Sequence, residues 1–133
     1  MRILICGDNQ EDYGYELKAD VSAVFGMLFW KTLQYQTVVH GATESIGAII
    51  DDLAEEYGWS VVARPLEEEE TSENQNVRLI EEEPDMVLYF IRNLGNLRWA
   101  PTVQHLVKLA QDVNIPVFDG REVSTRFMYE DEE

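Results

Sequence analysis

Short apolar runs alternate along this chain with segments of helical period, and this alternation leaves few folds open to it. A helix that packs on a sheet repeats its apolar residues at intervals of three and four, whereas a buried strand is a short continuous apolar run. Strands and helices that alternate at this spacing form right-handed crossovers and a parallel sheet. The sequence therefore predicts an α/β fold, a Rossmann-like three-layer sandwich with a parallel sheet of about five strands.

Each expected element follows from its own local pattern. Thr43 is the expected cap of the second helix, and the run 86–91, the most hydrophobic one, is expected to be a central strand covered on both faces. We expect strands at residues 2–6, 37–40, 59–63, 86–91 and 115–118. We expect helices at about residues 16–33, from the cap at Thr43 to a turn at residues 57–58, at 71–82 and at about 101–113.

The chain is long enough for one domain with its own core, at 133 residues. We divide it into a Rossmann-like domain at residues 1–120 and an acidic C-terminal tail at residues 121–133. Its apolar runs are too short to span a bilayer, and the opening run is too short for the core of a signal peptide. The single cysteine, Cys6, fits a reducing compartment, so we expect a cytoplasmic location and no membrane partner.

The formal net charge of −16 argues against a nucleic-acid partner, because the phosphate backbone would be repelled. The ten Lys and Arg residues are scattered, whereas acidic residues cluster at 67–70, 81–83 and 130–133. We interpret these clusters as a solvated loop, an exposed helix face and a frayed terminus. The alternative is that they mimic a polyanion or dock a basic partner.

In open parallel sheets, ligands bind beyond the carboxyl ends of the strands, where neighbouring connections diverge. Three connections reach that edge in the expected fold, at residues 7–13, 40–45 and 92–102. The ligand site is therefore expected among these loops.

The loop after the second strand is the best candidate, because free backbone N–H groups and the helix dipole favour an anion there. Gly41 permits close approach of the backbone, and Thr43 or Ser45 offers a hydroxyl to a phosphate or ribose. The alternative interpretation is a turn with a capping threonine, in which His40 is a structural hydrogen-bonding residue. The candidate ligand residues of this loop are His40, Gly41, Ala42, Thr43, Glu44 and Ser45.

The other two loops contribute further candidates. In the first, Gly7, Asp8 and Asn9 form either a ribose contact through the carboxylate of Asp8 or a helix cap. In the third, Arg98 and Trp99 combine a cation with a stacking surface, although Trp99 equally suits a core or interface anchor.

Residues Asn74, Asn76 and Arg78 lie where a loop could fold over the site, and a solvated linker explains them as well. The two histidines, His40 and His105, cannot build a metal cluster with one cysteine, so we expect no metal and no other cofactor. His105 is expected to face solvent from the last helix.

The apolar stretch 25–30 predicts contact with a second subunit, and hence a homodimer or a higher homo-oligomer.

Four stretches, in this order, resemble the YspA-like branch of the SLOG superfamily, which also contains the lonely-guy phosphoribohydrolases and the DprA proteins. They are residues 1–7, 38–42, 84–88 and 102–117. The resemblance covers nearly all of residues 1–118 and implies a Rossmann-like fold that binds nucleotide-derived ligands as a homo-oligomer. Thr102 takes the place of a Gly-Thr pair that precedes the family's last helix, and Asn74 partly matches an Arg-Asn pair.

Departures from the family pattern bear on catalysis. The first loop reads Gly7-Asp8-Asn9 where the family has Gly-Ser-Arg, and residues 42–47 replace Gly-Ala-x-Gly-Ala-Asp. The Gly-Gly-x-Gly-Thr-x-x-Glu signature of the phosphoribohydrolases is absent. We assign no catalytic residue and expect a binder of a nucleotide-derived small molecule that senses or sequesters a nucleotide signal.

Two alternatives from other classes stay open. The first is a hydrolase that cleaves an N-glycosidic or phosphate bond of a nucleotide, with Asp8 or Glu44 as the general base. The second is an acidic protein-interaction module whose pocket has decayed.

Overall fold

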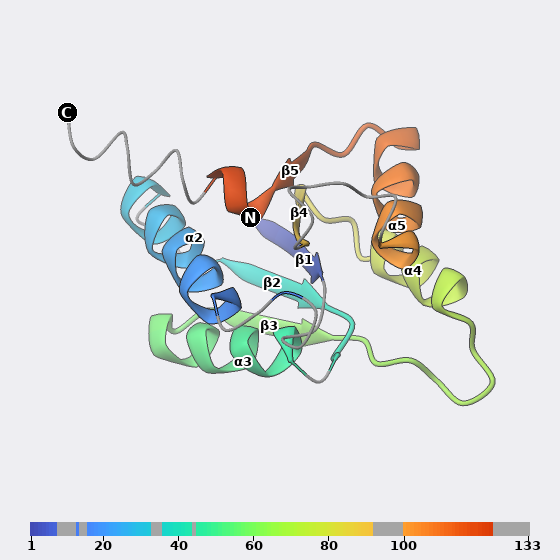
Figure 1. Cartoon of the computed structure of the whole chain (residues 1–133), viewed down its shortest axis with the longest axis horizontal. Helices are drawn as coiled ribbons and strands as arrows, with labels where there is room; N and C mark the ends of the chain where they lie inside the picture. The colour runs from blue at the N-terminus through green and yellow to red at the C-terminus, as the bar shows by residue number, and fades with distance from the viewer. Residues whose placement is uncertain (8–12, 14–15, 33–35, 44, 92–99, 124–133) are drawn as a thin grey trace.

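A computed structural model of the chain describes residues 1–7, 13, 16–32, 36–43, 45–91 and 100–123. Five parallel strands form one sheet in the order β3-β2-β1-β4-β5, with helices on both faces (Figure 1). The predicted α/β fold, a Rossmann-like three-layer sandwich, is confirmed. The elements are β1 Arg2–Gly7, α2 Leu17–Thr32, β2 Thr37–His40, α3 Ile46–Tyr57, β3 Ser60–Ala63, α4 Ser72–Glu81, β4 Met86–Phe90, α5 Pro101–Asp112 and β5 Val117–Asp119.

Two helices cover each face of the sheet. Helices α2 and α3 pack together on one face, and α4 and α5 pack together on the other (Figure 1). The first pair follows β1 and β2, whereas the second pair follows β3 and β4. The direction of the connections therefore reverses between the neighbouring strands β1 and β4, which is where ligand crevices open in such sheets.

The central strands supply both halves of the core. Because successive side chains of a strand point to opposite faces, Ile3 and Ile5 pack toward α2 and α3, while Leu4 packs toward α4 and α5. In β4, Leu88 and Val87 divide in the same way. The prediction of a central strand buried on both faces is confirmed. Its side chains form a continuous apolar run because both faces of the strand are covered.

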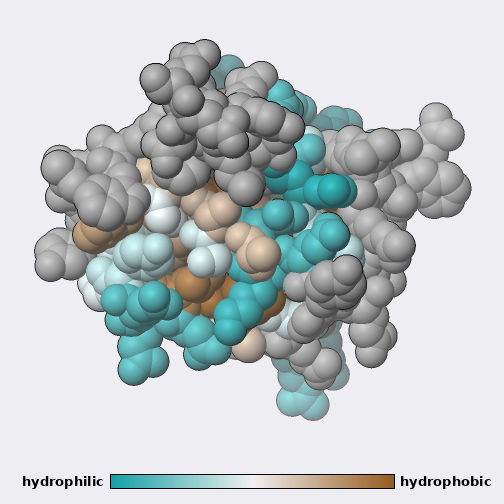
Figure 2. Space-filling view, turned by 60° about the vertical axis from the view of Figure 1, so that its left-hand side comes forward, coloured by the Kyte–Doolittle hydropathy of each residue, from teal (hydrophilic) through white to brown (hydrophobic). Residues whose placement is uncertain are grey.

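The apolar stretch of α2 serves the core of its own chain. Phe25 and Leu28 are buried, and the ring of Phe25 stacks on Trp59 with 4.9 Å between ring centroids. Figure 2 shows the molecule with the left-hand side of Figure 1 turned forward. On this surface, hydrophobic residues (brown) and hydrophilic residues (teal) lie next to one another. The partly buried side chains of Met27 and Phe29 also pack against this core.

The end of the described chain packs onto the domain. Residues 120–123 form a helical turn after β5, and Val123 lies against the core beneath α2 and α3. The rest of the acidic tail, residues 124–133, lies outside the described residues. Among the helices that the structure describes, none has the length and apolar character needed to cross a membrane.

Candidate functional site

The carboxyl ends of β1 and β4 meet at the point where the connections reverse. Gly7 pairs with Phe90 there, and a Cβ atom on Gly7 would lie 2.3 Å from the carbonyl oxygen of Phe90. Only glycine allows the two strands to approach this closely. The predicted ligand residues Asp8, Asn9, Arg98 and Trp99 lie outside the described residues.

Tyr13, which lies between β1 and α2 in the chain, is buried in the core. Its hydroxyl donates to Oδ2 of Asp20 at 2.5 Å, and the guanidinium of Arg121 lies over its ring, 5.5 Å from the centroid. Burial, and then the hydrogen bond to Asp20, raises the pKa of the Tyr13 hydroxyl. The phenol is therefore a fixed structural donor rather than an acid for chemistry at neutral pH.

His40 ends β2 and uses both of its ring nitrogens within the fold. Nδ1 accepts a hydrogen bond from the backbone N–H of Ala42 at 2.9 Å, and Nε2 lies 2.8 Å from Oδ1 of Asp51 on α3. Because Nδ1 accepts, the ring proton belongs on Nε2, which donates to the carboxylate. The residue is only 1% exposed. This geometry is that of a structural hydrogen-bonding histidine, the alternative that the sequence had left open.

The start of α3 differs from the expectation. The residue that caps this helix is Ser45, whose side chain makes no capping hydrogen bond, and Thr43 contributes only its carbonyl oxygen, to the N–H of Gly47 at 3.1 Å. The prediction that Thr43 caps the helix is therefore wrong. The side chain of Thr43 is exposed, and Glu44 lies outside the described residues.

Ala42 adopts a left-handed backbone conformation, with φ of 57°. This region costs an L-residue with a Cβ atom about 1–2 kcal/mol, and glycine occupies it freely. We expect Ala42→Gly to raise the free energy of unfolding by about 0.5–1 kcal/mol, after the larger entropy of glycine in the unfolded chain is subtracted. Urea denaturation measures this change, and a loss of stability would contradict it.

Gln75, a residue that sequence reasoning missed, joins this loop to α4. Its Nε2 atom donates to the carbonyl oxygens of Gly41 and Arg64, each at 3.0 Å, and its side chain is buried. The expected close approach at Gly41 is therefore made by Gln75, since a Cβ atom on Gly41 would lie 3.0 Å from Nε2. Its spacing of four residues from the buried Leu79 is the sequence signal that places Gln75 on the inward face of α4.

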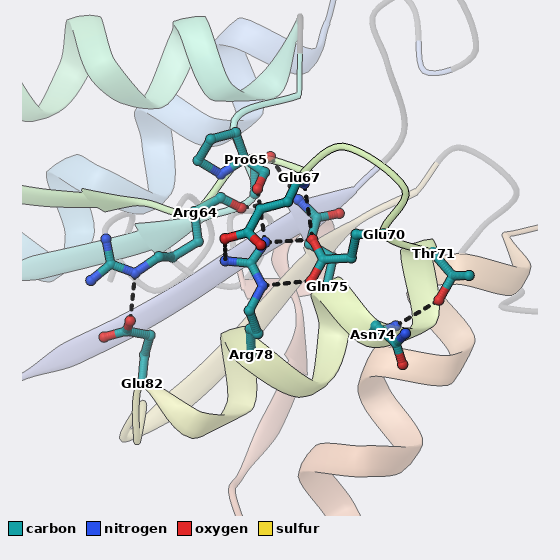
Figure 3. Close-up of polar contacts among 10 residues, drawn as sticks. Arg64, Pro65, Glu67, Glu70, Thr71, Asn74, Gln75, Arg78 and Glu82 are labelled. Atoms are coloured by element: carbon teal, nitrogen blue, oxygen red, sulfur yellow. Dashed lines mark hydrogen bonds and ion pairs between the residues drawn. The ribbon is translucent and has the colours of Figure 1, made fainter.

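The acidic run 67–70 leads into α4 and is partly fixed by Arg78. The guanidinium binds the carboxylate of Glu70 through two hydrogen bonds, of 2.6 and 2.5 Å, and also donates to the carbonyl oxygen of Pro65 (Figure 3). The hydrogen bonds from Arg78 lower the pKa of the Glu70 carboxyl. The other three glutamates of the run are exposed as expected, but the prediction of a solvated loop is wrong for Glu70.

A similar correction holds for the run 81–83. Glu82 accepts from Arg64 at 2.6 Å and from Arg2 at 2.8 Å, so it links the end of α4 to β1 and to the residue after β3 (Figure 3 shows the Arg64 contact). One glutamate of the expected exposed face therefore belongs to an ion-pair network. Gln75 and Glu82 therefore tie α4 to the residues at the ends of β1, β2 and β3, whereas Arg78 ties it to the loop that precedes it.

An open pocket of about 420 Å³ lies between the N-termini of α4 and α5. These termini follow β3 and β4, so the pocket is at the carboxyl edge of the sheet. Thr102, a predicted ligand residue, lines it, whereas Asn74 only donates its backbone N–H to the capping hydroxyl of Thr71 at 3.1 Å. The lining residues are Thr71, Ser72, Glu73, Asn76, Pro101, Thr102 and His105.

Asn76 and His105 connect the two walls of this pocket. The amide Nδ2 of Asn76 lies 3.0 Å from the carbonyl oxygen of Thr102 and 3.1 Å from Nδ1 of His105. Asn76 is 3% exposed and His105 is half-buried. The expectation that His105 faces solvent is therefore wrong, because α4 packs against that side of α5.

Cys6 is the one cysteine of the chain and lies near the carboxyl end of β1. Burial raises the pKa of its thiol from 9.0 to about 12, and only the thiolate reacts with alkylating agents. We expect iodoacetamide at pH 8 to modify the folded protein about 1,000-fold more slowly than the urea-unfolded protein, as measured by mass spectrometry, because the thiolate fraction falls about tenfold for each unit by which the pKa rises. Equal rates would show that the thiol ionises freely in the folded chain.

Within the described ranges, no group of three or more His, Cys, Asp or Glu side chains is placed to hold a metal ion. Neither a family model nor a curated protein matches this chain. The fold and the pocket define an α/β protein of Rossmann-like architecture with a small-molecule-sized opening at the carboxyl edge of its sheet.

Proposed function

We propose that this chain binds a nucleotide-derived small molecule, without transforming it, in the pocket between the N-termini of α4 and α5. The observation that carries the proposal is the pocket itself, whose volume of about 420 Å³ suits a small organic ligand. Its place at the carboxyl edge of the sheet is where Rossmann-like folds bind nucleotides. The resemblance to the SLOG superfamily supports the same class of ligand.

The lining of the pocket supports a ligand that is polar but not strongly anionic. Three hydroxyls, of Thr71, Ser72 and Thr102, offer donors and acceptors, and the Pro101 ring offers an apolar surface. Glu73 adds the only carboxylate of the described lining. A nucleoside presents the same mixture of hydroxyls and flat apolar surface.

The proposal extends to the role of the protein. Sensing or sequestering a nucleotide signal needs a binding pocket and no catalytic group, and we place this activity in the cytoplasm, where the single Cys6 thiol stays reduced. We include a homo-oligomeric state in the proposal, which sedimentation analysis of the purified protein would test.

A thermal-shift screen against nucleosides, mono- and dinucleotides, cyclic nucleotides and ADP-ribose tests the function. A ligand that binds only the folded state at 100 times its Kd adds about 2.7 kcal/mol of stability. We expect a selective hit whose affinity falls about 3- to 10-fold in Thr102→Val, which keeps the shape of the side chain and removes its hydroxyl.

Thr37→Val is the matched control, because Thr37 opens β2 at the opposite edge of the sheet. It should leave the affinity of the hit unchanged. A uniformly flat screen would overturn the proposed function and favour an acidic interaction module.

A further inference from the structure

The buried amide of Asn76 lies within hydrogen-bond distance of a histidine that lines the pocket. We propose that Asn76 holds His105 in the tautomer with its proton on Nε2, and that the pocket uses this N–H to bind a sugar hydroxyl of a nucleoside. The recognition half of this inference rests on the proposed function, whereas the tautomer half rests on geometry alone.

The orientation of the Asn76 amide follows from its partner on α5. The carbonyl oxygen of Thr102, 3.0 Å away, can only accept, so the NH2 group of Asn76 must face it. If the amide were turned over, two carbonyl oxygens would face each other at this distance in a buried place. The amide therefore has one fixed orientation.

The tautomer of His105 follows from that orientation. The second hydrogen of the Asn76 NH2 group points to Nδ1 of His105 at 3.1 Å, so Nδ1 must be the acceptor. A neutral imidazole with an accepting Nδ1 carries its proton on Nε2. His105 thus enters ligand binding as a donor, and Asn76 is its positioning residue.

The chemistry of the lining then selects the group that is bound. His105 Nε2–H donates and the Glu73 carboxylate accepts, and a hydroxyl is the common ligand group that can satisfy both. A phosphate only accepts, and it would face the negative charge of Glu73. Among the described residues that line the pocket there is no Lys or Arg to compensate that repulsion. A ribose, with two vicinal hydroxyls, fits these conditions.

The tautomer is measured without any ligand. In uniformly ¹⁵N-labelled protein, long-range ¹H–¹⁵N correlation separates a protonated ring nitrogen from an accepting one. We expect an accepting Nδ1 and a protonated Nε2 for His105 at a pH where the ring is neutral. Asn76→Asp replaces the NH2 donor by an acceptor and should move the proton to Nδ1.

His40 is the internal control, since the chain has only two histidines. Its Nδ1 accepts from the backbone N–H of Ala42, so its signals should also report a protonated Nε2 and should not change in Asn76→Asp. A protonated Nδ1 of His105 in the wild-type protein, or equal populations of the two tautomers, would overturn the inference. This readout needs no variant, so it stands even where Asn76→Asp fails to fold.

Binding is measured by calorimetry with adenosine, guanosine, cytidine and uridine, with their 2′,3′-dideoxy counterparts, and with inorganic phosphate. We expect a ribonucleoside to bind about tenfold more tightly than its dideoxy counterpart. His105→Gln keeps an N–H donor and should stay within about threefold of wild type, whereas His105→Phe should lose about tenfold. Gln111→Ala, on the exposed far end of α5, is the matched control.

The outcomes separate the two proposals. If ribonucleosides bind but neither His105→Phe nor the dideoxy compounds change the Kd, the inference is wrong and the proposed function stands. Binding of inorganic phosphate in this pocket, with no response to nucleosides, would overturn the sugar assignment. If nothing binds in either screen, the proposed function and the recognition role of His105 both fail, while the NMR result still decides whether Asn76 sets the tautomer.

Discussion

Gly7→Ala is expected to lower the free energy of unfolding by more than about 3 kcal/mol, the largest effect we expect of a single added methyl group. The new Cβ atom would lie 2.3 Å from the carbonyl oxygen of Phe90 and 3.1 Å from its carbonyl carbon. Both are backbone atoms of β4, so they cannot rotate away as a side chain could. Relief requires that β1 and β4, the two central strands next to the reversal point, move apart.

Gly26→Ala is the matched control, because it adds the same methyl group inside α2. The nearest atom to its Cβ is the Tyr57 hydroxyl at 3.4 Å, and alanine is favoured over glycine in a helix by about 1 kcal/mol. We expect this variant to be neutral or slightly stabilised. Urea denaturation followed by circular dichroism measures both variants, and a Gly7→Ala protein as stable as wild type would contradict the described approach of β1 to β4.

His40→Ala is expected to cost about 3 kcal/mol of stability, because it removes a buried ring and leaves the N–H of Ala42 without its acceptor. The effect should appear in the absence of any ligand, since both ring nitrogens serve the fold. The same denaturation experiment measures it.

Asp51→Asn is the companion variant. The Asp51 side chain is 56% exposed, and the amide oxygen of asparagine still accepts from Nε2 of His40, so we expect a loss below about 0.5 kcal/mol. If His40→Ala instead kept its stability and lost ligand binding, His40 would be a ligand residue, as the first interpretation of the loop had it.

The local pattern of the chain predicted nearly all of the architecture. Periodicity of three and four placed α2, α3 and α5 within one or two residues, and even the polar α4 was found from Val77, Leu79 and Ile80. Such patterns are readable because each helix buries one repeated face, whereas an interior strand is buried on both faces and appears as a continuous apolar run. The errors lie at element ends, where a cap is decided by one backbone conformation: Ser45 rather than Thr43 begins α3.

The candidate site was predicted only in part. Thr102 was chosen from its place before the last helix and does line the pocket. For Asn76 the sequence left open a loop over the site or a solvated linker, and His105 was expected to face solvent from the last helix. Their inward direction comes from α4 packing on α5, a contact that neither helix reveals by its own pattern.

The sequence by itself determined the order and type of the elements and the interior position of the run 86–91 in the sheet, because these depend on spacing and apolar character within short segments. Only the tertiary structure decided which polar side chains meet. Asn76 contacts Thr102 across 26 residues of chain, and Gln75 contacts Gly41 across 34. A hydrogen bond requires that its donor and acceptor lie within about 3 Å of each other. The local pattern of a segment does not determine its distance from another segment that lies far away in the sequence.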